Sequence, residues 1–268
     1  MPSDVPHLPS EQNPAEPVFH LYMALAAALP LDVQSGLGGK LLYAGELNSE
    51  GRNLLYAANI AGAASLAASA DPTVQRQAIR DGVIDFLVTS LEEALRILKN
   101  EIRKHQPVSV GVSADPHQLA AQMLDRGVLP DLLPAVSLNQ ASAIDPAQAE
   151  KFLSQGSRHV LNPPPNQLAG QGKFITWSVD RQFARWLPQL DTLAQQVLPT
   201  DDTLRRRWLR LAPRYLGRIA QKEHGVLFTA HESARFRTEV ERLLTDHSGD
   251  TGEPIRVTIS APEQVADK

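Results

Sequence analysis

Strands and helices alternate along residues 41–131 of this chain, and that alternation constrains the fold more than any other feature. Short β-branched runs such as VIDFLV and VSVGV are typical of buried strands, and helical patterns follow them. Parallel strands need crossover connections, so this spacing predicts a parallel sheet with helices on both faces. The expected strands are residues 41–47, 65–69, 83–88, 108–112 and one within 128–136; the expected helices are 53–64, 72–80, 116–126 and one capped by Thr89 or Ser90.

The first connection of this sheet, Asn48–Arg52, is predicted to be a turn, and it lacks the glycines that normally hold a dinucleotide phosphate. Such glycines let backbone N–H groups at a helix N-terminus approach the pyrophosphate. The glycine-rich stretch Gly36–Gly39 does not replace them, because it precedes the first strand; a tight turn is the expected structure there. The layout favours a nucleotide-type fold, and the turn chemistry argues against the usual ligand.

Composition and pattern divide the chain into three parts. Residues 1–18 are rich in proline and polar residues and are predicted to be a flexible arm. Residues 19–150 form the expected α/β domain, and residues 151–268 a smaller α/β region, possibly packed on the same sheet. The last part has expected strands at 173–179, 225–230 and 255–259, the last two in a possible βαβ unit, and expected helices at 181–197, 203–222 and 233–244.

The composition argues against several function classes. A net charge of −4 gives no general attraction to nucleic acid or to an anionic membrane. The absence of cysteine excludes disulfides, thiolate nucleophiles and cysteine–zinc sites, and the eight histidines lack metal-type spacing. The apolar run Leu21–Leu31 is too short to span a membrane and is interrupted by Pro30. We therefore expect a cytoplasmic protein with no metal, no nucleic acid and no membrane among its partners.

Polar side chains follow the ends of the expected strands. Ligands of open α/β sheets bind outside the carboxyl ends of the strands, so these side chains are candidates for a small-molecule pocket. The alternative is that they cap the helices that follow. The candidate binding residues are Asn48, Ser49, Gly51, Arg52, Ser69, Asp71, Ser113, Asp115, Ser137 and Asn139.

Two features of the C-terminal part have both a functional and a structural interpretation. The basic helix that carries Arg205–Arg207, Arg210, Arg214 and Arg218 has the chemistry to clamp phosphate or carboxylate groups. A solvated face opposite an apolar stripe is the alternative. His224 and His231 flank an expected strand and could meet a substrate, or they could be ordinary surface histidines.

Several stretches of the expected sheet carry a family resemblance: LYAANIAGAASL at Leu55–Leu66, TSLEEAL at Thr89–Leu95, VSV at Val108–Val110, RGVLPDL at Arg126–Leu132, and Asp145-Pro146. Through them, residues Gly45–Asp145, or about 36–146 at the widest, resemble the NAD-binding segment of urocanate hydratase (urocanase). The resemblance implies a Rossmann-like, doubly wound, mostly parallel sheet, here followed by the smaller α/β C-terminal part. It also implies NAD as the cofactor and a homodimer.

The positions that bind the cofactor in the family differ here. The family turn Gly-Gly-Met-Gly-Gly corresponds to Asn48–Arg52, where only Gly51 is kept. The carboxylate of Glu50 would repel a bound anion, and the charge of Arg52 would partly offset that repulsion. A ribose-binding Glu of the family corresponds to Ser69, a following Arg to Val74, and a Gln-Thr-Ser-Ala-His stretch to residues 136–140. The essential cysteine has no counterpart.

We therefore expect a urocanase-like protein that lacks urocanase activity and binds a small molecule or nucleotide in a non-catalytic or regulatory role. The identity of the cofactor stays open, since the resemblance implies NAD and the loop chemistry opposes it. One alternative is an enzyme of lyase or hydratase type, with or without NAD, whose rebuilt site uses His224, His231 or the basic helix. Another is a structural protein that forms oligomers.

Overall fold

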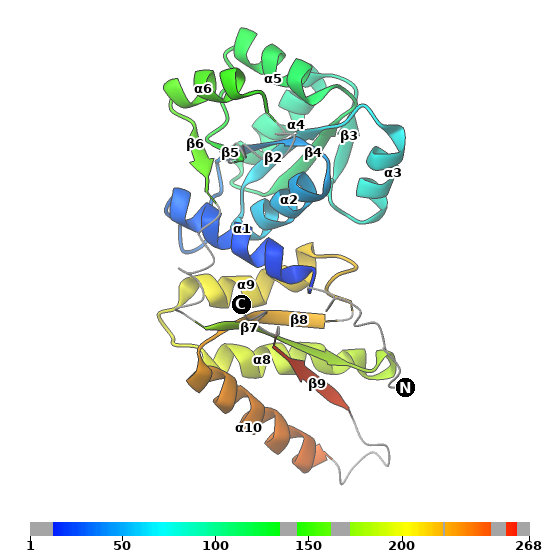
Figure 1. Cartoon of the computed structure of the whole chain (residues 1–268), viewed down its shortest axis with the longest axis vertical. Helices are drawn as coiled ribbons and strands as arrows, with labels where there is room; N and C mark the ends of the chain where they lie inside the picture. Colours follow the sequence, from blue (N-terminus) through cyan, green and yellow to red (C-terminus); the bar gives the residue numbers. More distant parts are fainter. Residues whose placement is uncertain (1–12, 135–143, 162–171, 222, 248–255, 262–268) are drawn as a thin grey trace, which may run out of the picture.

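The computed structural model describes residues 13–134, 144–161, 172–221, 223–247 and 256–261. Its larger part is a parallel six-stranded sheet with the strand order β3-β4-β2-β1-β5-β6 (Figure 1). The order reverses between β1 and β5, so their carboxyl ends flank the topological switch point of the sheet. The strands are β1 (Leu41–Glu46), β2 (Ala64–Ala68), β3 (Phe86–Val88), β4 (Val108–Val112), β5 (Leu132–Pro134) and β6 (Arg158–Val160).

Helices cover both faces of this sheet. One face packs against α4 (Leu91–Arg103), α5 (Pro116–Asp125) and α6 (Pro146–Ser154). The other packs against α2 (Ser49–Ala61) and α3 (Pro72–Arg80). Every residue of β2 and β4 is buried, because strands between two helix layers have no solvent-facing side. The predicted Rossmann-like, doubly wound α/β fold is confirmed.

The C-terminal part has a sheet of its own. β7 (Lys173–Val179) lies between β8 (Glu223–Phe228) and β9 (Val257–Ser260) and is antiparallel to both. β8 and β9 are therefore parallel to each other, and the expected βαβ unit has β7 inserted between its two strands. The helices of this part are η1 (Arg181–Trp186, a 3-10 helix), α8 (Leu187–Val197), α9 (Thr203–Tyr215) and α10 (Ala230–His247).

The first helix, α1 (Ala15–Ala28), lies between the two parts (Figure 1). It packs along α2 on one side and against α9 and β8 on the other. The Phe19 ring meets the Trp208 ring edge to face at a centroid distance of 5.0 Å and lies 5.4 Å from the Phe174 ring. The hydroxyl of Tyr22 donates to the carbonyl of Leu204 at 3.0 Å. One apolar core therefore runs from the parallel sheet into the C-terminal sheet.

Several element boundaries differ from the expectations: the strand expected at 83–88 begins at Phe86, the helix expected at 203–222 ends at Tyr215, and the helix expected at 181–197 is divided into η1 and α8. Three further differences affect the architecture. The first is that α1 begins at Ala15, within the segment expected to be an arm, and buries Ala15 and Val18. The second is that the parallel sheet continues past the expected boundary at residue 150, because α6 spans that boundary and β6 adds a strand. The third is that α2 begins at Ser49, four residues before the predicted start, and ends at Ala61, followed by the C-cap Gly62 with a φ of 97°.

Candidate functional site

The connection from β1 to α2 is the part of the carboxyl edge that a dinucleotide would meet first. Asn48 is the N-cap of α2, and its side-chain Oδ1 accepts a hydrogen bond from the Gly51 N–H at 3.0 Å. The Arg52 N–H donates to the Asn48 carbonyl at 3.0 Å. The predicted turn is thus the first turn of a helix, and its own cap takes up the Gly51 donor.

Gly51 is needed for packing between backbones. A Cβ added at this position would lie 1.9 Å from the carbonyl oxygen of Glu46. Only glycine lets the helix start so close to the end of β1. Ser49 and Glu50, which precede it in the helix, are exposed.

The side chain of Arg52 is held by Asp81, with which it forms a hydrogen-bonded ion pair. Gln77 donates its Nε2 to both carboxylate oxygens of Asp81 at 2.9 Å. Burial would raise the pKa of Asp81, but the hydrogen bonds from Gln77 and Arg52 outweigh burial and lower it. Arg52 is therefore committed to a carboxylate and does not offset the charge of Glu50 as the resemblance implied.

In the connection from β2 to α3, the polar side chains also form hydrogen bonds with the start of the following helix. Asp71 is the N-cap of α3 and accepts from the Thr73 N–H at 2.7 Å. Ser69 is buried; its hydroxyl accepts from the Asp71 N–H at 3.2 Å and its carbonyl from Gln75 Nε2 at 2.6 Å. These two candidates fix the start of α3.

The next two connections follow the same pattern. Asp115 caps α5 by accepting from the Gln118 N–H at 3.0 Å. Ser90, and not Thr89, is the N-cap of α4: its hydroxyl accepts from the Glu93 N–H at 3.3 Å, while the Glu93 carboxylate accepts from the Thr89 N–H at 3.0 Å. These bonds form a variant of the capping box, in which the Glu93 carboxylate reaches the residue before the cap. Among the described connections at this edge, helix capping is the main use of polar side chains.

The sheet order places these candidates on one edge. β1, β2 and β4 are neighbours, so the caps Asn48, Asp71 and Asp115 follow three adjacent strand ends. Ser113 continues β4, donates its N–H to the Val88 carbonyl at 2.9 Å and is half-buried. Ser137 and Asn139, the candidates beyond β5, lie outside the described residues.

The described residues of this edge do not fit the pyrophosphate of a dinucleotide. The Gly51 N–H, which a phosphate would need, already bonds to Asn48. Glu46 and Glu50 are exposed carboxylates beside that turn, and Asp71 and Asp115 add two more along the edge. An anion would meet repulsion there. A cationic molecule would meet a favourable potential, and a neutral molecule would meet no repulsion.

The histidines of the C-terminal part do not form a second centre at this edge. His224 lies on β8, where its Nδ1 is 2.8 Å from both carboxylate oxygens of Asp191 and its Nε2 is 2.8 Å from the Ala220 carbonyl. Trp177 Nε1 donates to the same carboxylate at 3.1 Å. This buried cluster holds α8 against the C-terminal sheet, and His231 is exposed at the start of α10.

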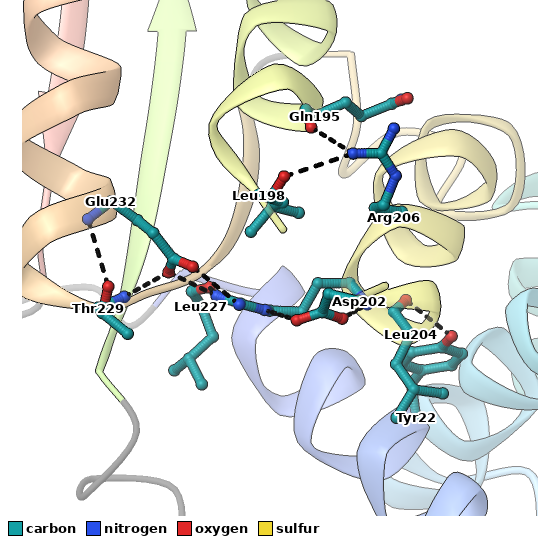
Figure 2. A network of polar contacts seen from close by, with 10 residues as sticks. Tyr22, Gln195, Leu198, Asp202, Leu204, Arg206, Leu227, Thr229 and Glu232 are labelled. Carbon is teal, nitrogen blue, oxygen red and sulfur yellow. Dashed lines mark hydrogen bonds and ion pairs between the residues drawn. The ribbon is translucent and has the colours of Figure 1, made fainter. Parts of the chain in front are cut away.

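The basic helix, α9, uses three of its arginines for structure. Arg205 pairs with Asp202 and with Glu232, whose carboxylate also accepts from the Thr229 N–H at 2.8 Å (Figure 2). Arg206 donates to the Gln195 carbonyl at 2.8 Å (Figure 2). The predicted solvated face is thus wrong for Arg205, Arg206 and the buried Arg207, and it holds for Arg210, Arg214 and Arg218, which are exposed.

Within the described ranges, no helix has the length and apolar character needed to cross a bilayer. The same residues contain no group of three or more histidines and carboxylates placed to hold a metal ion.

A family model matches the larger part of this chain. The model of the urocanase Rossmann-like domain matches residues 21–157, just over half of the chain. The match begins within α1 and ends just before β6, so it covers most of the parallel sheet and leaves out the C-terminal sheet. The resemblance seen in the sequence is confirmed.

Proposed function

Because this chain belongs to the family of the urocanase Rossmann-like domain, we propose that it is a binding protein built on that fold and without urocanase activity. We place its site at the carboxyl ends of β1 and β5, where the strand order reverses, because folds of this kind bind their ligands there. Its ligand is a small neutral or cationic molecule, bound in a non-catalytic or regulatory role. Cytoplasmic location and a homodimer belong to the same proposal, and light scattering tests the dimer.

The start of α2 is the observation that carries this proposal. The family uses a run of glycines there, whereas this chain has Asn48 as a cap, Glu50 as an exposed carboxylate and Gly51 with its N–H occupied. At this turn a dinucleotide phosphate would therefore find neither free backbone N–H donors nor an attractive potential. The chain also has no cysteine to supply the residue that the family requires.

Restoring the family turn tests the exclusion of NAD. We expect no binding of NAD⁺ to the unaltered protein by titration calorimetry up to millimolar concentration. The double variant Asn48→Gly, Glu50→Gly is expected to gain at least about tenfold in affinity, because it frees the Gly51 donor and removes a repelling carboxylate. Ser49→Ala, an exposed change in the same turn, is the control. Micromolar binding of NAD⁺ to the unaltered protein would show that the turn does not exclude it.

Ligand binding itself needs a separate measurement. Thermal shift with adenosine, nicotinamide and a panel of neutral and amine-bearing metabolites should find a stabilising compound. Glu46→Gln and Asp115→Asn should weaken a cationic hit, because both residues line the carboxyl edge. Absence of any shift across the panel would overturn the binding role. Loss of urocanate absorbance in the presence of added NAD⁺ would overturn the assignment as non-catalytic.

The alternative, an enzyme with a rebuilt site in the C-terminal part, has no comparable support. Both ring nitrogens of His224 are occupied by Asp191 and Ala220. His231 is exposed, and the arginines from 205 to 207 bond to protein groups. These arrangements explain the residues without a substrate.

A further inference from the structure

A cleft lies at the amino ends of the strands, opposite the carboxyl edge. It has a volume of about 840 Å³ and is lined at the amino ends of β3 and β4, along α4, and by the last residues of α9. Phe86 and Val108, the first residues of their strands, form part of its wall. The volume lies in the range of about 300–1,000 Å³ that is typical of small-molecule sites. The cleft is formed jointly by the two parts of the chain.

The lining of this cleft carries two carboxylates and two guanidinium groups, so its formal charges balance, and the bonds of the carboxylates decide which groups are open to a ligand. Asp85 Oδ2 accepts from the Ser109 N–H at 2.8 Å. Glu101 Oε1 accepts from Lys104 Nζ at 2.9 Å and from Asn100 Nδ2 at 2.8 Å. Both carboxylates of the lining are therefore already bonded to protein donors.

The two arginines of the lining remain available. Arg96 and Arg214 are exposed, and among the described residues neither forms an ion pair within 4.0 Å. Glu92 and Glu93 on the same helix interact electrostatically with Arg96, but neither carboxylate forms an ion pair within 4.0 Å of its guanidinium group. Arg96 comes from the first part and Arg214 from the second, so an anion between them would be held from two sides.

Two aromatic rings add flat apolar surface to the same cleft. Tyr215 lies under the Arg214 guanidinium, whose Cζ is 5.2 Å from the centroid of the ring. Phe86 is 48% exposed, which is unusual for a phenylalanine at the start of a strand. Aromatic faces beside arginines bind the flat rings of nucleobases by stacking. The amide of Gln106, also in the lining, can hydrogen-bond a base edge.

We propose that this cleft binds a nucleoside monophosphate. The phosphate lies between Arg96 and Arg214, and the base packs against Phe86 and Tyr215. A single phosphate on a flat heteroaromatic ring matches two free guanidinium groups beside two rings, whereas free phosphate would leave the rings unused. This site is independent of the proposed ligand at the carboxyl edge, since the two lie at opposite ends of the strands.

Calorimetry with AMP as the probe tests the site. AMP is expected to bind, and adenosine and ribose 5-phosphate are expected to bind at least about tenfold more weakly, because each lacks half of the contacts. Arg96→Gln, Arg214→Gln and Phe86→Ser are each expected to weaken AMP binding about tenfold or more. Arg103→Gln on α4 and Arg210→Gln on α9 are matched controls, exposed on the same helices but outside the lining.

Several results of these measurements would overturn the proposed AMP site. Absence of AMP binding at millimolar concentration, or equal affinity for AMP and adenosine, would overturn the proposal. Unchanged AMP affinity in both arginine variants, with circular dichroism spectra like that of the unaltered protein, would do the same. An AMP affinity that falls in Asp115→Asn but not in Arg96→Gln would place the nucleotide at the carboxyl edge instead and refute this cleft.

Discussion

Arg207 is a buried cation whose hydrogen bonds go to carbonyl oxygens. Its guanidinium donates to Ile60 and Gln34 at 3.1 Å, to Ser35 at 3.3 Å and to Ala61 at 3.4 Å. Burial lowers the pKa of Arg207. The acceptors Ile60 and Ala61 end α2, where the helix dipole favours a positive charge. This contact ties α9 to α2 across the junction of the two parts.

Two glycines make room for that guanidinium. A Cβ at Gly36 would lie 2.5 Å from Arg207 Nη2, and a Cβ at Gly62 would lie 2.9 Å from the same atom. Both glycines also have positive φ values, of 67° and 97°. The glycine-rich stretch before β1 and the small residues at the end of α2 thus serve one arginine 145 or more positions later in the chain.

Replacing Arg207 by methionine should lower the free energy of unfolding by about 3 kcal/mol, since buried carbonyls lose their donor. Urea denaturation followed by circular dichroism measures the change. Arg210→Met, an exposed change one turn further on, should stay within about 0.5 kcal/mol. Equal effects of the two variants would contradict the role given to Arg207.

The contribution of Glu232 to the stability of the folded protein depends on pH. Burial would raise its pKa, but hydrogen bonds from Arg205 and the Thr229 N–H outweigh burial, so the pKa lies below its ordinary value of 4.5. The unfolded chain takes up the proton first as pH falls. The stabilisation is therefore complete above the ordinary glutamate pKa and is lost as pH falls through the lowered value.

Denaturation midpoints in urea between pH 7 and pH 3 test this dependence. Glu232→Gln should be less stable at pH 7 and should lose less stability toward pH 3 than the unaltered protein. Glu241→Gln, exposed on the same helix, should leave the profile unchanged. Parallel profiles for the unaltered protein and Glu232→Gln would show that the carboxylate does not matter.

Local sequence patterns indicate most of these residues but not the groups to which they form hydrogen bonds or ion pairs. Asn48, Asp71 and Asp115 are cap-type residues, and local spacing predicts their capping role. The partners of Arg207 lie in two distant segments, and nothing in the sequence near residue 207 points to them. The ion pair of Arg52 with Asp81 likewise depends on how α3 packs beside α2. Long-range contacts of this kind follow from tertiary packing, which local patterns do not encode.

Among the elements, α2 shows best where local patterns succeed and fail. Its apolar character predicts a helix, and the turn-type residues of Asn48–Arg52 predict that this helix starts only at Asn53. The Asn48 cap and the small Gly51 permit four more helical residues. In contrast, α3, β4 and β7 match their predicted bounds, since Pro72 marks the start of α3 and β-branched runs mark the two strands.

Gly51→Ala should destabilise the protein, although the same change in most helices stabilises by about 1 kcal/mol. The added methyl group would lie 1.9 Å from the Glu46 carbonyl, so α2 or the end of β1 must move. We expect a loss of about 2 kcal/mol in urea denaturation. Ser49→Ala, exposed in the same turn, is the control. A gain of stability in Gly51→Ala would mean that the close approach is not rigid.

At the scale of the whole molecule, α1 joins the two sheets in one apolar core. Both parts should therefore unfold together. Two signals distinguish them: all three tryptophans, Trp177, Trp186 and Trp208, lie in the C-terminal part, whereas far-ultraviolet circular dichroism reports on every helix. Coincident thermal transitions by fluorescence and dichroism are expected.

Phe19→Ala should separate or lower these transitions, because Phe19 contacts both Phe174 and Trp208. We expect the fluorescence midpoint to fall by several degrees, in keeping with a loss of about 3 kcal/mol for a buried phenylalanine. Val33→Ala, at a side chain that is 78% exposed, should leave the midpoint unchanged. Two separate transitions in the unaltered protein would show that the parts unfold independently.

The alternation of strands and helices was enough to predict the parallel sheet, because each unit carries its own start and stop signals. The C-terminal sheet is harder to predict, since β7 is antiparallel to both of its neighbours and is separated from β8 along the chain by η1, α8 and α9. Nothing in the pattern of β7 indicates that it lies between β8 and β9. The role of α1 as the bridge was also not visible, because its apolar run shows burial without showing against what.

The position of α1 has a consequence for synthesis on the ribosome. Tyr22 and its acceptor, Leu204, are 182 positions apart in the sequence, and Phe19 and its partner Trp208 are similarly far apart. A growing chain can complete the parallel sheet while one side of α1 still lacks its covering layer. Until α9 emerges, that side is an apolar surface of the kind that chaperones recognise on nascent chains.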